Sequence, residues 1–172
     1  KKKCSQMLNF DTLFLDRDGV INKKLQGKYV RHFSEFEFIP GALDALAKLT
    51  KVFNRIIIIT NQQGIGKKIM SDSDLNILHV RMEEEIEKSE GKISKIYYCP
   101  HLQEINCLCR KPEPGMILQA IIDFPSIVIK DSYLIGDSDT DIAAGQRINL
   151  NTIKVDNNYT LAECTSDLLS TL

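Results

Sequence analysis

Short apolar runs alternate along this chain with amphipathic segments. The apolar, β-branched runs predict strands at residues 12–15, 55–60, 95–99, 132–136 and 151–155. Apolar residues at helical spacing predict four helices. One begins at Pro40, and the other three cover residues 71–89, 114–123 and 139–146. The isoleucine run inside residues 55–60 is typical of a central strand covered on both faces. This alternation predicts an α/β fold, a three-layer, doubly wound parallel sheet with right-handed crossovers.

The length and charge of the chain limit the number of domains and the kinds of partner to expect. A chain of 172 residues fits a single domain, 1–172, and can bury a proper core. Its net charge of −1 and the lack of a basic stripe argue against a nucleic-acid partner. Asn9 and Asp11 interrupt the apolar stretch behind Lys1-Lys2-Lys3, so neither a signal peptide nor a membrane span is predicted. We therefore expect a cytoplasmic monomer without a membrane partner.

Two acidic signatures, DRDGV at residues 16–20 and GDSDTD at 136–141, each follow a predicted strand. Residues just past the carboxyl ends of strands line the ligand crevice of an open α/β sheet. Carboxylates that converge there repel one another unless a cation lies between them, which predicts an oxygen-liganded ion such as Mg²⁺. An Asp-Gly pair is often only a turn. The i, i+2 spacing instead favours Asp16 as a nucleophile and Asp18 as a proton donor and acceptor.

Two further segments suit a phosphate ligand. In TNQQGIG, residues 60–66, the Thr60 hydroxyl, side-chain amides and backbone N–H groups predict a phosphate nest. The alternative is an ordinary polar turn after a strand. In the basic pair, Lys111 supplies a point charge for a phosphoryl group, and Arg110 can grip a second anionic group. The alternative for this pair is solvation at the surface.

A cysteine-rich loop directly precedes the basic pair. Cys99, His101, Cys107 and Cys109 suit a closed tetrahedral Zn²⁺ site, which would be structural and would hold Arg110 and Lys111 over the crevice. The chain has five cysteines, and neither this odd number nor the size of the domain suggests a disulfide framework. Some cysteines and histidines have no partner at ligand spacing and are predicted to be bystanders, the histidines on the surface or on a helix face: Cys4, Cys164, His32 and His79.

Together these residues resemble the haloacid dehalogenase superfamily of phosphatases. Asp16 and Asp18 match its first motif, Thr60 its second, Lys111 its third, and Asp137 with Asp141 its fourth. More narrowly, the chain looks like the D,D-heptose 1,7-bisphosphate phosphatases in several segments: DRDGVIN, GxYV, TNQ, the CxH…CxC loop and RKPxPGM. The histidinol-phosphate phosphatases share this subfamily and its zinc loop.

The resemblance implies roles for these residues. Asp16 is the nucleophile and Asp18 the general acid/base. Mg²⁺ is held by Asp16, the Asp18 carbonyl and Asp137, with Asp141 supporting the metal from behind. Thr60 and Lys111 steady the phosphoryl group, while substrate recognition falls to Asn61, Gln62 and Arg110. The stretches between motifs are too short for a large cap domain, so the loop at residues 22–30 and the zinc loop shape the entrance.

The function that the resemblance implies is a Mg²⁺-dependent phosphatase. It removes the C7 phosphate of D-glycero-D-manno-heptose 1,7-bisphosphate through an aspartyl-phosphate, on the route to nucleotide-activated heptose. Lys23, Lys24, Gln63 and the short zinc loop depart from the heptose pattern and leave a histidinol-phosphate phosphatase as the alternative. The missing basic surface disfavours a polynucleotide 3′-phosphatase. A non-catalytic zinc-binding module would leave the aspartates dispensable.

Overall fold

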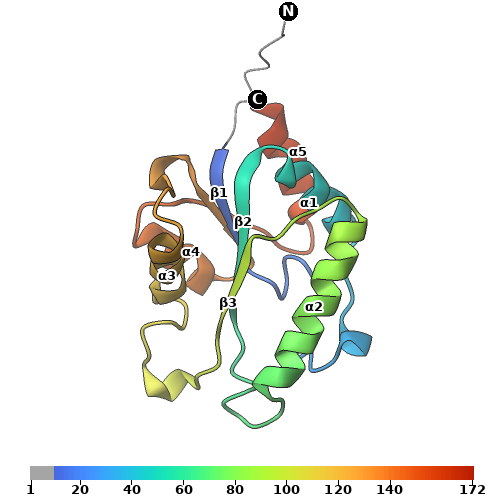
Figure 1. Ribbon diagram of the computed structural model, residues 1–172, viewed down its shortest axis with the longest axis vertical. Coiled ribbons are helices and arrows are strands. Elements are labelled where there is room, and N and C mark those ends of the chain that lie inside the picture. The colour runs from blue at the N-terminus through green and yellow to red at the C-terminus, as the bar shows by residue number, and fades with distance from the viewer. Residues whose placement is uncertain (1–9) are drawn as a thin grey trace, which may run out of the picture.

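The computed structural model describes residues 10–172, whose strands form one parallel sheet with helices on both faces (Figure 1). The sheet order is β3-β2-β1-β4-β5, formed by β1 (Phe10–Leu15), β2 (Phe53–Asn61), β3 (Lys95–Cys99), β4 (Tyr133–Gly136) and β5 (Asn151–Lys154). The helices are α1 (Ala42–Thr50), α2 (Asp72–Lys88), α3 (Gly115–Asp123), α4 (Asp139–Gln146) and α5 (Leu161–Ser170). Short 3-10 helices are η1 (Phe33–Glu35), η2 (Gln103–Ile105) and η3 (Ile129–Asp131). The predicted three-layer α/β fold is confirmed.

The two central strands divide the core into two layers. Along β2, Ile56 and Ile58 pack into the cluster under α1, α2 and α5, while Ile57 and Ile59 pack into the cluster under α3 and α4. Successive side chains of a strand point to opposite faces, so an unbroken apolar run fills both layers. This strand is covered on both faces, as its sequence predicts.

The start of helix α2 shows the expected capping chemistry. Ser71 and Asp74 form a reciprocal capping box at the start of α2, as their spacing predicts.

Helix α5 is not among the helices predicted from the sequence. Its residues Leu161, Cys164 and Leu168 lie on one face and pack into the core beside α1. The sequence carried this stripe, but no motif drew attention to it.

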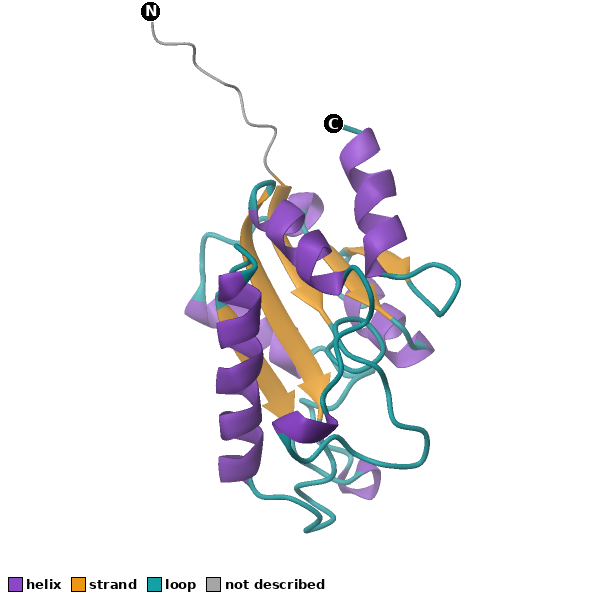
Figure 2. Ribbon diagram, turned by 90° about the vertical axis from the view of Figure 1, so that its right-hand side faces the viewer, coloured by secondary structure: helices purple, strands orange, loops and turns teal. Residues whose placement is uncertain are grey.

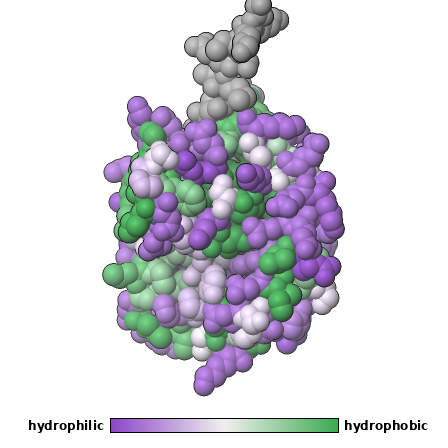
Figure 3. Space-filling view, in the orientation of Figure 1, coloured by the Kyte–Doolittle hydropathy of each residue, from purple (hydrophilic) through white to green (hydrophobic). Residues whose placement is uncertain are grey.

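Residues 1–9 lie outside the described part of the chain, and with them the predictions for Lys1-Lys2-Lys3 and Cys4. Within residues 10–172, no helix is both long and apolar enough to cross a membrane. The connection at residues 16–41, between β1 and α1, contains η1 rather than an inserted domain. Figure 3 shows hydrophilic residues over much of one face, with hydrophobic residues gathered in patches among them.

The sheet topology places the acidic signatures next to each other. The strand order reverses between β1 and β4, and in such sheets ligands bind at the carboxyl ends beside this switch point. Leu15 pairs with Ile135, and the next N–H, that of Asp16, donates to the Ile135 carbonyl at 3.1 Å. The strands all point to the same end of the molecule, where long loops gather (Figure 2).

Candidate active site and metal-binding residues

Three carboxylates converge at the end of β1 and β4. Oxygens of Asp16, Asp137 and Asp141 lie within 4.8 Å of one another. One oxygen of Asp137, Oδ1, is buried and has no hydrogen-bond partner among the described residues, while Oδ2 accepts from Lys24 Nζ at 3.1 Å. Carboxylate oxygens are the donors that Mg²⁺ takes in proteins. The cluster therefore fits a Mg²⁺ ion, and it brings together the predicted ligands Asp16 and Asp137.

Two glycines permit this convergence. Gly19 has φ +89°, and a Cβ there would lie 2.2 Å from Oδ2 of Asp137. A Cβ on Gly136 would lie 2.3 Å from the Cβ of Asp141. Only glycine lets the backbone approach another group this closely. The glycine in each acidic signature thus makes room for a carboxylate of the second signature.

Lys111 offsets part of the negative charge of the carboxylate cluster. Its Nζ lies 2.8 Å from Asp16 Oδ1 and 2.6 Å from Asp141 Oδ1, and it donates to the Ile59 carbonyl at 2.9 Å. Burial alone would lower the pKa of Lys111, but the two carboxylates raise it, so the ammonium stays charged. Burial raises the pKa of Asp16 to about 7; Lys111 opposes this rise, and Asp141 and Asp18 add to it.

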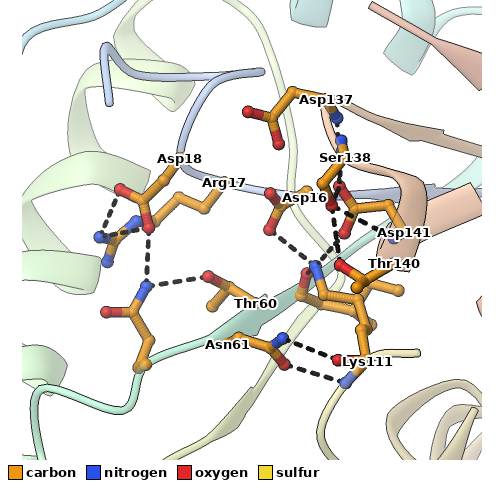
Figure 4. Close-up of polar contacts among 12 residues, drawn as sticks. Asp16, Arg17, Asp18, Thr60, Asn61, Lys111, Asp137, Ser138, Thr140 and Asp141 are labelled. Atoms are coloured by element: carbon orange, nitrogen blue, oxygen red, sulfur yellow. Dashed lines mark hydrogen bonds and ion pairs between the residues drawn. The ribbon is translucent and has the colours of Figure 1, made fainter. Parts of the chain in front are cut away.

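Asp18 is held apart from this cluster. Figure 4 shows its carboxylate turned toward Arg17, whereas Asp16 turns toward Lys111. Arg17 Nη2 donates to both oxygens of Asp18, at 2.8 and 3.0 Å, and the side-chain amides of Asn22 and Gln62 each add a bond of 2.9 Å. Burial would raise the pKa of Asp18, but Arg17 and these hydrogen bonds hold it below its ordinary value. In this conformation Asp18 is an ionised acceptor.

The polar groups predicted to contact the substrate are largely engaged within the protein. The Gln62 amide donates to Asp18 and, at 2.8 Å, to the Thr60 hydroxyl, and the Gln62 side chain is buried. Asn61 exchanges two hydrogen bonds with the backbone of Lys111, at 3.1 and 3.2 Å. These contacts position Asp18 and the Lys111 loop, although Asn61 and Gln62 also line the pocket.

The predicted backbone nest at residues 60–66 is wrong for three of its N–H groups. The N–H of Gln62 donates to the Cys99 carbonyl at 2.7 Å. The N–H of Ile65 donates to the Gln62 carbonyl at 3.2 Å, and that of Gly66 to the Pro100 carbonyl at 3.0 Å. The segment folds as a turn packed on the cysteine-rich loop. These three N–H groups therefore donate to protein carbonyls, as the ordinary turn alternative expects.

A pocket of about 430 Å³ opens beside the carboxylates, a size that suits a small-molecule ligand. Its basic lining comes from separate segments, namely Lys24, Lys28, Lys67, Arg110 and Lys111. One guanidinium nitrogen of Arg110, Nη1, is buried and has no partner among the described residues, so it is available to an anion. Sequence reasoning missed Lys28 and Lys67, because only the fold brings their segments to one pocket. The loop at residues 24–30 lines it, as expected for the entrance.

The sequence predicts His79 on the surface or on a helix face, and the prediction of a surface position is wrong. The residue is 5 % exposed and its Nε2 lies 3.1 Å from Arg17 Nη1. It falls four residues after Leu75, on the buried side of α2. This position in the apolar stripe is the signal that could have identified it. His32, in contrast, is exposed.

The four predicted soft ligands form one cluster. Cys99, Cys107 and Cys109 have Sγ atoms 3.0–3.5 Å apart, and His101 Nδ1 lies 3.2 Å from Cys109 Sγ. One donor atom from each of the four lies within 4.8 Å of the others. Thiolates and an imidazole are the donors of closed tetrahedral Zn²⁺ sites. Cys164 lies in the main core, away from this cluster.

Comparisons with known proteins agree with this geometry. Residues 108–167 match the model of the HAD-hydrolase-like family. The chain is 38% identical over 136 residues to a D-glycero-alpha-D-manno-heptose-1,7-bisphosphate 7-phosphatase of Mycobacterium bovis, covering 79% of this chain and 72% of that protein. It is 38% identical over 152 residues to a D-glycero-beta-D-manno-heptose-1,7-bisphosphate 7-phosphatase of Helicobacter pylori, covering 88% and 83%.

The fold is similar to the crystal structure of a D,D-heptose 1,7-bisphosphate phosphatase from B. bronchiseptica complexed with magnesium and phosphate. The TM-score is 0.86 at 27% identity, over 94% of this chain and 99% of the other. Magnesium and phosphate are thus ligands of a protein with this same fold.

Proposed function

Because this chain belongs to the heptose-1,7-bisphosphate 7-phosphatases, within the haloacid dehalogenase-like hydrolases, we propose that it removes the C7 phosphate of D-glycero-D-manno-heptose 1,7-bisphosphate. The reaction is the hydrolysis of a phosphoric monoester. The observation that carries the proposal is the position of Asp16, held between the Lys111 ammonium and a neighbouring Asp137 oxygen that has no partner in the described chain. A nucleophilic carboxylate needs cations beside it, because an anionic phosphate must approach it; Lys111 is one, and an ion held by Asp137 would be a second.

The proposed reaction has two displacements on phosphorus. Asp18, an ionised acceptor in this structure, must first take up a proton from solvent. An oxygen of Asp16 then bonds to phosphorus as the bond to the C7 oxygen breaks, and Asp18 gives its proton to that leaving oxygen. Asp18, now ionised, then takes a proton from water as the water oxygen attacks the aspartyl-phosphate. Inorganic phosphate leaves and Asp16 is restored. Lys111 offsets the negative charge of the phosphoryl oxygens in both steps.

Two sets of residues would each hold a metal ion. The Asp16 and Asp137 carboxylates and the Asp18 carbonyl would hold Mg²⁺, with Asp141 behind them. Bound there, the ion would orient the phosphate and offset its charge. Cys99, His101, Cys107 and Cys109 would hold a structural Zn²⁺ that fixes the loop ending at Arg110 and Lys111.

Substrate choice falls to the basic rim of the pocket. A bisphosphate places its second phosphate away from the reacting one, where Arg110, Lys28 and Lys67 line the pocket. Arg110, with an unpartnered buried nitrogen in the described structure, is suited to that group. Histidinol phosphate has no second phosphate, which favours the heptose substrate. We further propose that residues 1–172 act as one cytoplasmic, monomeric domain, and the net charge of −1 supports the lack of a nucleic-acid partner.

The test is Mg²⁺-dependent phosphate release from three substrates measured side by side. These are the α and β anomers of the heptose bisphosphate and histidinol phosphate. Relatives named for either anomer are 36–40% identical to this chain, so both anomers belong in the assay. A preference for histidinol phosphate would overturn the substrate, and no release from any substrate would overturn the reaction.

Two variants connect the activity to the site. Asp16→Asn keeps the shape of the side chain and is expected to abolish turnover while the melting temperature stays close to that of the wild type. Asp139→Asn is the matched control, because Asp139 lies in the same acidic signature with its carboxylate exposed beside Lys154. It is expected to keep full activity. Equal activity of both variants would exclude Asp16 as the nucleophile.

A further inference from the structure

A buried histidine ends the hydrogen-bond chain that holds Asp18. His79 Nε2 lies 3.1 Å from Arg17 Nη1, and the other terminal nitrogen of Arg17, Nη2, donates to both oxygens of Asp18. Arg17 is fully buried, and His79 is 5 % exposed. The chain joins α2 to the loop after β1, although His79 and Arg17 are 62 positions apart. No step of the proposed reaction uses His79.

The charge state of His79 decides the direction of this hydrogen bond. Burial and the adjacent Arg17 lower the pKa of His79 to about 3, although Asp18 opposes this effect. The imidazole is therefore neutral near neutral pH. Because Arg17 is a donor only, the Nε2 of His79 must accept, which places the ring proton on Nδ1.

Few other groups fix the guanidinium of Arg17. Its Nε has no hydrogen-bond partner in the described part of the chain. The Phe36 ring lies against it, with the Cζ atom 5.9 Å from the ring centroid, a contact that does not select an angle within the guanidinium plane. Among residues 10–172, the directed contacts of the planar group are thus Asp18 on one side and His79 on the other.

We propose that His79 is a positioning residue for proton transfer by Asp18. By accepting from Nη1, the imidazole sets the orientation of Arg17, and Arg17 in turn holds the Asp18 side chain in place, both when it donates a proton to the leaving oxygen and when it later takes one from water. His79 does not touch the substrate. The inference rests on the proposed function, because it assigns His79 to the general acid of that reaction.

Two substrates with different leaving groups show whether a His79 variant loses proton donation by Asp18 or loses activity in general. Protonation by Asp18 matters for a sugar alkoxide, a poor leaving group, and little for p-nitrophenolate, a good one. The parameter kcat/KM reports only the steps through leaving-group departure, so it excludes the later attack of water. For His79→Leu, we expect kcat/KM to fall about ten-fold on the heptose bisphosphate, part of the ~10²–10⁴ that a general acid contributes, and to change less than about two-fold on p-nitrophenyl phosphate.

Two further variants control this result. His79→Gln keeps an acceptor near the position of Nε2 and is expected to restore most of the heptose activity. Met82→Ala removes a buried side chain of the same helix that is not part of the hydrogen-bond chain, so it measures loosened packing alone. It is expected to affect both substrates equally. An equal loss on both substrates for His79→Leu, or no rescue by His79→Gln, would overturn the inference.

A spectroscopic measurement on the wild-type protein does not depend on any variant folding. Nitrogen NMR of the histidine rings should show His79 as the neutral Nδ1–H tautomer at neutral pH. An imidazolium or an Nε2–H tautomer would contradict the proposed bond. Failure of the proposed function is distinguished by the wild-type assay: if the unmodified protein does not hydrolyse the heptose bisphosphate, the reaction is wrong rather than the role of His79.

Discussion

The ammonium nitrogen of Lys111 lies 2.8 Å from Oδ1 of Asp16, although the two residues are 95 positions apart in the chain. Both side chains are almost fully buried, with 3% and 11% of their side-chain surface exposed. This pair joins the loop after the cysteine cluster to the end of β1. It makes the charge of the proposed nucleophile depend on a residue from a distant segment.

Replacing Lys111 by Met is expected to lower both stability and activity. A buried carboxylate that loses its partner costs about 3–5 kcal/mol of unfolding free energy. Loss of the charge beside the phosphoryl group should lower kcat by roughly 10²–10³-fold. Urea unfolding and steady-state kinetics measure the two effects. Lys154→Met is the control, because its pair with Asp139 is exposed to solvent and contributes little to stability. Similar losses in both variants would contradict the special role of Lys111.

The pH dependence of catalysis should follow the ionisation of Asp16. The nucleophile must be a carboxylate, and burial raises its pKa to about 7, so kcat/KM should rise with pH toward neutrality when Mg²⁺ is scarce. A cation beside Asp16 favours the ionised form, so saturating Mg²⁺ should move this rise to lower pH. The measurement is a pH profile at several Mg²⁺ concentrations. A profile that is independent of Mg²⁺ would speak against Asp16 as a ligand.

The stability of the protein toward acid should depend on His79. Its pKa is about 3 when folded and 6.5 ordinarily, so between these values the unfolded chain binds a proton that the native state excludes. The unfolding free energy should therefore fall as pH falls through this window, by up to about 1.4 kcal/mol per pH unit.

Asp16 acts in the opposite sense in part of this window. Its raised pKa means that the native state holds a proton that the unfolded chain has released. The unfolding free energies of wild type and His79→Gln should therefore be compared, because both proteins contain Asp16 and its contribution cancels. Urea unfolding at pH 4.5 to 7 should show a shallower loss for the variant, and parallel curves would exclude this contribution of His79.

Adding a methyl group to Gly19 should disrupt the metal site. The new Cβ would lie 2.2 Å from Asp137 Oδ2, in addition to the strain of φ +89°. Gly27→Ala is a matched control, because Gly27 also has a positive φ, +66°, but a Cβ there meets no atom within 4 Å. The Mg²⁺ concentration at half-maximal activity should rise for Gly19→Ala only. If both variants respond alike, backbone strain explains the effect rather than contact with Asp137.

Disruption of the cysteine cluster should release bound zinc and impair catalysis indirectly. In Cys107→Ser a harder donor replaces a thiolate, so we expect a lower zinc content by elemental analysis and a lower kcat, because Arg110 and Lys111 directly follow the cluster. Cys164→Ala is the control, since Cys164 lies in the main core. It should lose stability and keep its zinc. Wild-type protein without zinc, or a Cys107→Ser variant with normal kcat, would refute the proposed role.

Local patterns in the sequence were enough for most of the fold. The isoleucines of β2 identify a strand covered on both faces, and the Ser71 and Asp74 pair marks the start of α2. Such signals act within one element, through side-chain periodicity and capping. Helix α5 shows their limit: its stripe of Leu161, Cys164 and Leu168 is apolar at the right spacing, yet it gains meaning only from the core that it covers.

The chain's own sequence determined the chemistry of the site, because the acidic signatures follow strands whose parallel order must bring their ends together. It also determined the four soft ligands, which lie within eleven residues, 99–109. Only the tertiary structure decided how each polar group is used. Gln62 and Asn61 bind Asp18 and the Lys111 backbone, and His79 turns inward to Arg17. Such long-range partners depend on side-chain directions in three dimensions, which no local pattern specifies.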